Sequence, residues 1–227
     1  MANISGVLCA KRRQKWLVVA IIFFIKLGIV MAVVAGAGRQ AMAFSDVEFQ
    51  GAFQQFSAQP GTEQQAADAF LALLKQDPAN PLLMSYAGAA TTKLATTTFF
   101  PWKKMSYSEE GMAMLDKALQ LLAADSGTLH GSMPVALEVK FVAASTFLAV
   151  PGFMNRAARG SKLLAEVLAH PQFGKAGVAF RGAVWMRAAL LAVGQQRKED
   201  ARRYLQAVIQ SGAPQTDAAR QLLKGVV

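Results

Sequence analysis

The chain has 227 residues, a formal net charge of +10 and one cysteine. That residue, Cys9, precedes the first hydrophobic stretch, which excludes a domain stabilised by disulfide bonds. The charge is uneven, because residues 1–43 hold six Lys and Arg with no Asp or Glu, and residues 151–227 hold twelve against four. We expect the basic C-terminal third to be a solvated surface or a face for an acidic protein or anionic lipid headgroups.

A basic segment followed by a hydrophobic one opens the chain. Four Lys and Arg between positions 11 and 15 precede the apolar tract Trp16–Gly38, so we expect the rest of the chain to cross a membrane. The tract is long enough for a transmembrane anchor with Trp16 and Lys26 as membrane residues. The Ala-Met-Ala sequence at 41–43 is instead typical of a signal peptide cleaved after Ala43. Both alternatives stay open, and a retained Lys26 inside lipid would indicate a partner helix.

Capping signals predict the first helices of the remaining chain, residues 44–227. Ser45 and Glu48 form a capping box, and Thr62 with Gln65 forms a second one. The apolar positions expected on the first helix are Val47, Phe49, Phe53 and Phe56.

Prolines and periodic apolar residues predict the other helix ends. Asp77-Pro78 ends one helix and Asn80-Pro81 begins the next, whose small residues 87–90 allow close approach of another helix. The expected helices cover about 62–76, 80–96, 106–123, 134–149, 155–169, 175–194 and 197–210, with one more after Pro214. No segment alternates like a strand between hairpin turns, so we expect an all-α domain.

A spacing of small, large and apolar residues recurs along these helices. It is clearest in Ala66, Phe70 and Leu73, followed by Pro78. The other copies are Gly111, Leu115 and Ala118; Ser161, Ala165 and Leu168; and Ala201, Leu205 and Val208, with Trp185 before them. This pattern resembles the tetratricopeptide-repeat family, although the repeats are longer than the roughly 34 residues of that family. The resemblance implies a right-handed α-solenoid of about four divergent helix pairs, preceded by the N-terminal hydrophobic helix, that binds a peptide, a helix or a protein surface.

Motifs for chemistry are sparse. The sequence has no phosphate-binding glycine loop, no cysteine cluster and no paired-histidine motif. His130 and His170 are far apart, and we expect His170 to cap a helix C-terminus. We therefore expect no catalytic residue, cofactor or metal site.

The connection at residues 96–107 is the strongest candidate for function. It combines aromatic and basic side chains: Phe99, Phe100, Trp102, Lys103, Lys104 and Tyr107. Such a set suits a protein interface or a membrane surface, and it also suits aromatic rings that fold back between helices. If helix pairs stack in order, the connection before Arg156 and Arg159 emerges on the same edge and adds both arginines to this surface.

These patterns favour a non-catalytic interaction or scaffold subunit. We expect it in the bacterial inner membrane, with its C-terminal domain on the periplasmic side of a cell-envelope membrane protein complex and without a nucleic-acid partner. The alternative is a soluble periplasmic protein with a cleaved signal that binds peptides or small ligands. A third hypothesis is an enzyme acting on cell-wall material, which would need polar groups converging in a pocket.

Overall fold

The computed structural model describes residues 44–58, 60–122 and 127–226. The chain divides into two units, Met1–Met42 and Ala43–Val227, and the described residues belong to the second. The predictions for Trp16, Lys26 and the possible cleavage site at 41–43 lie outside the described residues. Within the described residues, no helix is long and apolar enough to cross a bilayer.

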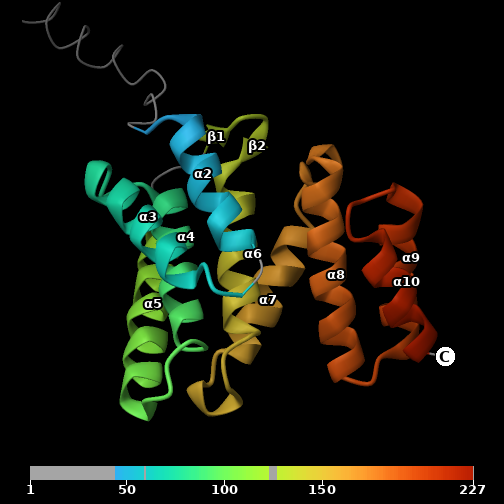
Figure 1. The fold of residues 1–227 in the computed structure, drawn as a ribbon. Helices are drawn as coiled ribbons and strands as arrows, with labels where there is room; N and C mark the ends of the chain where they lie inside the picture. Colours follow the sequence, from blue (N-terminus) through green and yellow to red (C-terminus); the bar gives the residue numbers. More distant parts are fainter. Residues whose placement is uncertain (1–43, 59, 123–126, 227) are drawn as a thin grey trace, which may run out of the picture. The chain divides into compact units, whose positions relative to one another are not determined.

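The described part is all-helical apart from one small hairpin (Figure 1). Its α-helices are α2 (Asp46–Ser57), α3 (Glu63–Gln76), α4 (Pro81–Leu94), α5 (Pro101–Leu121), α6 (Val135–Phe147), α7 (Ala157–Leu168), α8 (Val178–Gly194), α9 (Lys198–Ser211) and α10 (Thr216–Gly225). Two 3-10 turns, η1 (Gly152–Met154) and η2 (Phe173–Lys175), lie beside α7. The all-α prediction is confirmed except that β1 (Leu129–His130) and β2 (Met133–Pro134) pair between α5 and α6.

Two of the three predicted N-terminal helix caps are confirmed. The backbone N–H of Glu48 donates to Ser45 Oγ, and that of Ser45 donates to Glu48 Oε2. Asn80 Oδ1 accepts from the next two free N–H groups of α4. The box predicted for Thr62 is wrong, because Thr62 Oγ1 donates instead to the Gln55 carbonyl at 2.7 Å. That bond ties the end of α2 to the start of α3.

Helix α4 is the centre of the first part of the fold. It packs against α3, α5 and α6, and nearly all of its residues are buried. The small flank predicted at 87–90 allows α5 to approach closely, since a Cβ added at Gly111 would lie 2.4 Å from the Gly88 carbonyl oxygen and 2.1 Å from Thr92 Oγ1. Only glycine fits at this crossing.

Aromatic rings fill the space between α2, α3 and α4. Phe49 lies 5.7 Å from Phe70 and 5.3 Å from Tyr86, measured between ring centroids. Phe53 and Phe56 also face Tyr86, so these predicted apolar positions are confirmed. Val47 was wrongly placed on that face, because it is 81% exposed.

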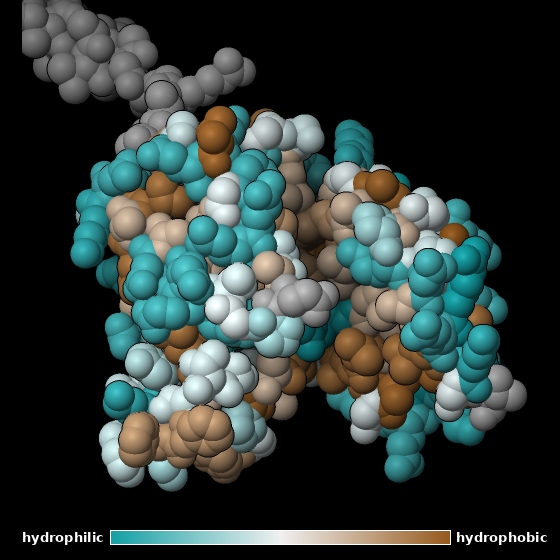
Figure 2. All heavy atoms as spheres, viewed as in Figure 1, coloured by the Kyte–Doolittle hydropathy of each residue, from teal (hydrophilic) through white to brown (hydrophobic). Residues whose placement is uncertain are grey.

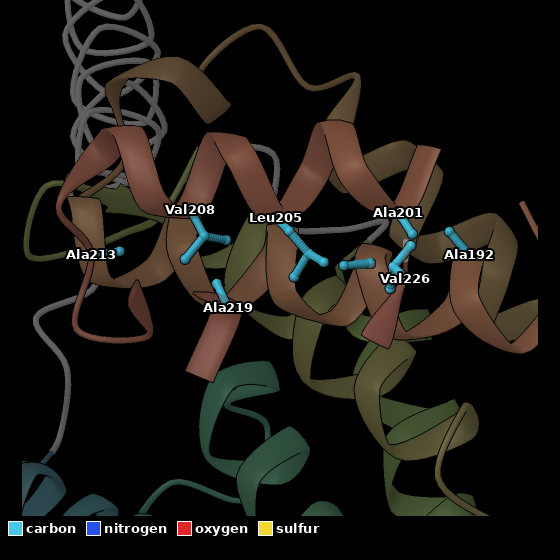
Figure 3. Packing of buried hydrophobic residues seen from close by; sticks show 8 residues of the cluster. Ala192, Ala201, Leu205, Val208, Ala213, Ala219 and Val226 are labelled. Carbon is cyan, nitrogen blue, oxygen red and sulfur yellow. The ribbon is translucent and has the colours of Figure 1, made fainter. Parts of the chain in front are cut away.

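A second hydrophobic cluster lies between α8, α9 and α10 (Figure 3). In the close-up, Val208 lies next to Ala219 of α10, and Ala201 lies next to Val226. The full set of buried residues is Ala189, Ala192, Ala201, Leu205, Val208, Ala213, Ala219 and Val226. Helix α8 packs closely on α9 and only slightly on α7.

The small–large–apolar spacing corresponds to buried positions in four helices. These positions are Ala66, Phe70 and Leu73 of α3; Gly111, Leu115 and Ala118 of α5; and Ala201, Leu205 and Val208 of α9. In α7 the buried set is Gly160, Leu164 and Val167. The prediction for that helix, which began at Ser161, was therefore displaced by one residue.

Candidate functional site

Helix α5 begins earlier than expected, and this changes the geometry of the aromatic segment. Its first residue is Pro101 rather than Ser106, because proline needs no N–H partner at the first helical position. Trp102, Lys103, Lys104 and Tyr107 therefore lie in the first two turns of a helix. The connection itself shortens to residues 95–100.

The aromatic side chains of this segment are largely exposed. Phe99 is 95% exposed and Trp102 is 66% exposed, so the folded-back arrangement is wrong for both. Phe100 and Trp102 pack on each other with ring centroids 4.9 Å apart, and Lys103 Nζ lies 5.5 Å from the Phe100 ring centroid. Tyr107 differs, because it is partly buried one turn further along α5.

A further exposed aromatic residue lies on the connection between α6 and α7. Phe153, in η1 between α6 and α7, is 68% exposed. Figure 1 shows the α4–α5 and α6–α7 connections at the same end, as predicted, and Figure 2 shows hydrophobic surface over that end. We call Phe99, Phe100, Trp102, Lys103, Lys104 and Phe153 the aromatic end. Residues 95–107 and 148–156 contain no Asp or Glu.

Arg156 and Arg159 do not extend the aromatic end. Both pair with Asp116 of α5, Arg156 at 2.9 Å. Their guanidinium groups also lie over the Phe147 ring, 5.3 and 5.5 Å from its centroid. Asp116 comes fourteen residues after Trp102, which is about 21 Å along a helix. These arginines therefore join α5, α6 and α7 within the fold.

The structure reveals a buried polar chain that the sequence analysis missed. Glu138 of α6 accepts a hydrogen bond from Tyr86 Oη at 2.6 Å through Oε1, and its Oε2 lies 2.9 Å from His130 Nδ1. The His130 ring in turn lies against Phe49, with centroids 4.5 Å apart. The sequence did contain a signal for this buried polar chain, because Glu138 is the only glutamate in the most apolar described helix. A buried carboxylate needs hydrogen-bond partners.

Contacts with Glu138 and burial shift the pKa values of Tyr86 and His130. Burial, together with the nearby Glu138 carboxylate, raises the pKa of Tyr86 well above its usual value, so its phenol stays a donor. The hydrogen bond to Glu138 raises the pKa of His130 above 6.5, against the opposing effect of burial.

A cavity of about 620 Å³ lies beside α5, α6 and α7. Apolar side chains such as Leu119 and Leu163 line it together with Lys140, Glu166 and His170. Lys140 Nζ bonds Glu166 Oε2 at 2.7 Å, and His170 Nδ1 accepts the Gln172 N–H at 3.2 Å. The charged lining is therefore already paired. His170 lies just after α7, at the helix end where it was expected.

Comparisons with known proteins give no match for the chain, whether with a family, a curated protein or a solved structure. Within residues 44–58, 60–122 and 127–226, no group of three or more His, Cys, Asp or Glu is placed to hold a metal ion. The inference of function therefore rests on the geometry of the aromatic end and of the cavity.

Proposed function

We propose that the protein is a non-catalytic interaction subunit whose helical repeats present the aromatic end to a protein partner. The exposure of Phe99 and Trp102 beside Lys103 and Lys104 carries this proposal, and Phe153 adds an exposed ring on the α6–α7 connection at the same end. Exposed aromatic residues at one place are costly in water and typical of interface hot spots. The four buried small–large–apolar sets support a helical solenoid similar to tetratricopeptide repeats.

The arrangement of exposed residues suits a protein partner. The start of α2 lies at the opposite end of the described part from the aromatic end in Figure 1. Exposed aromatic rings with lysines at one place are typical of the hot spots of protein interfaces.

The proposal extends to location, which is the inner membrane of a bacterial envelope with this domain in the periplasm. The partner would be a component of a membrane protein complex. Lys103 and Lys104 favour an acidic surface on that partner, because residues 95–107 carry no compensating carboxylate.

The test is recovery of partners from gently solubilised membranes with a C-terminally tagged full-length chain. Trp102→Ala should reduce partner recovery about tenfold or more, with helix content unchanged. Val47→Ala is the control, because Val47 is also an exposed apolar residue but lies at the start of α2, away from the aromatic end. Equal recovery by Trp102→Ala and wild type would remove the aromatic end as the docking surface.

The intact mass of the recovered chain tests the anchor separately. A full-length chain in fixed ratio with a membrane protein supports the subunit. A chain that begins at Phe44, alone and in the soluble fraction, supports the alternative of a soluble periplasmic binder. The cavity beside α6 and α7 is the feature that favours this alternative, since its size suits a small ligand.

A further inference from the structure

The buried polar chain joins four elements that are distant in sequence. Glu138 comes from α6, Tyr86 from α4 and His130 from the hairpin, and the His130 ring packs on Phe49 of α2. His130 therefore contacts the core through one polar and one aromatic interaction. Tyr86, Glu138 and His130 do not line the cavity beside α5, α6 and α7.

The hairpin depends on contacts of this kind for its position. Its strands have two residues each, and an isolated two-stranded hairpin is marginal in water. Leu129 on the same strand is half exposed, so His130 is the residue that directs the strand into the core. Helix α2 packs mainly on α3, and its Phe49 ring lies between the His130 ring and Tyr86 of α4, with centroids 4.5 and 5.3 Å away.

We propose that His130 is a proton-controlled latch, which when charged fastens the β1–β2 hairpin and α2 to α4 and α6, and which loosens both on losing its proton. This device goes beyond the proposed docking function.

The charged groups around the imidazole favour its protonated form. Glu138 of α6 contacts Nδ1, and Asp46 of α2 adds a weaker attraction. Tyr86 of α4 stays neutral and occupies the other Glu138 oxygen. The hairpin residues from Leu129 to Pro134 contain no other titratable side chain.

The sign of the effect follows from the direction in which the pKa moves. The pKa of His130 in the folded chain is raised above 6.5, so its stabilising effect is complete below about pH 6.5 and is lost as pH rises through the folded value. The latch is therefore closed in mildly acidic medium and open in alkaline medium. Local protection of the hairpin and α2 should therefore fall as the pH rises through the folded pKa of His130.

The test combines two exchange measurements by mass spectrometry on the full-length chain in detergent. Slow exchange of the imidazole C2 hydrogen gives a pKa for each of the two histidines in the chain, His130 and His170. Amide exchange, corrected for intrinsic rates, is followed for α2 and the hairpin from pH 5.5 to 9, with α9 as the internal control.

The expected result is a His130 pKa above 6.5 and a loss of α2 and hairpin protection at that same midpoint, with α9 unchanged. His170→Gln should leave this loss in place. Glu138→Gln, which keeps the size of the side chain, should lower the His130 pKa. A His130 pKa at or below 6.5 in the wild-type chain, or α2 protection that stays constant through the titration, would overturn the latch.

Discussion

Helices α2, α3 and α4 meet through phenylalanine and tyrosine rings, whereas α8, α9 and α10 meet through alanine and branched aliphatic side chains. The first region also buries polar groups. Among the described residues, the buried polar and charged side chains are Glu63, Ser85, Thr91, Thr92, Ser108 and Glu138, all in or before α6.

This difference shows two ways to hold helices of similar length. In the first region, a few large rings and hydrogen bonds such as that from Tyr86 to Glu138 fix one arrangement, because a buried carboxylate requires particular partners. In the second, small side chains let backbones approach, and packing of many weak contacts supplies the stability. The slight contact between α7 and α8 further implies that the regions can lose structure separately.

The largest expected effects come from truncating one core residue in each region. Phe70→Ala should cost about 3–5 kcal/mol of unfolding free energy, and Leu205→Ala about 2–5 kcal/mol, since both side chains are fully buried. The measurement is urea unfolding followed by far-UV circular dichroism and by fluorescence of Trp185, which packs on the second cluster, in a background where Trp16 and Trp102 are changed to Phe. Leu205→Ala should shift the Trp185 transition more than the total helix signal. Coincident shifts in both variants would show one cooperative unit instead.

Close helix approach gives the next effect. Gly111→Ala should lower the unfolding free energy by about 1–3 kcal/mol or more, because its Cβ would meet the backbone of α4. Gly51→Ala in α2 is the control, since nothing lies within 4 Å of its added Cβ, and it should gain about 0.5–1 kcal/mol. Thermal unfolding of both variants measures the contrast. A neutral Gly111→Ala would show that α4 and α5 separate easily.

The buried polar chain should show strong coupling. Glu138→Leu leaves the Tyr86 hydroxyl and the His130 ring without their partner, which should cost about 1–3 kcal/mol. Tyr86→Phe combined with Glu138→Leu should recover part of that loss, since removing both partners of a bond is cheaper than removing one. A double-mutant cycle by urea unfolding measures this coupling. Simple additivity of the two changes would mean that the hydrogen bond has no specific role.

The smallest effect is expected at the half-exposed ion pairs. Asp116→Ala removes the partner of Arg156 and Arg159 and should cost less than about 1 kcal/mol, with a smaller cost in high salt. Asp217→Ala, which removes the highly exposed pair with Arg220 in α10, is the comparison and should have no measurable effect. Thermal unfolding at low and high salt distinguishes them. If Asp217→Ala lost more unfolding free energy than Asp116→Ala, the stronger polar contacts would not lie in the first region.

The sequence predicted much of the local structure for identifiable reasons. The caps at Ser45 and Asn80 follow from side-chain oxygens close in sequence to free N–H groups, and most helix boundaries lie within a few residues of those expected. The start of α5 was missed although Pro101 offered the same signal as Pro81. The aromatic residues beside it outweighed that signal in the interpretation as a loop.

Local sequence alone determined the helical class, most helix ends and the buried faces of most helices, because these depend on neighbours within about four residues. It also identified Phe99, Phe100 and Trp102 of the aromatic end. Only the tertiary structure decided that Trp102 points to solvent, that Arg156 and Arg159 turn inward to Asp116, and that Tyr86, Glu138 and His130 meet. These outcomes depend on groups brought together from distant helices, and no local periodicity encodes which of them end up in contact.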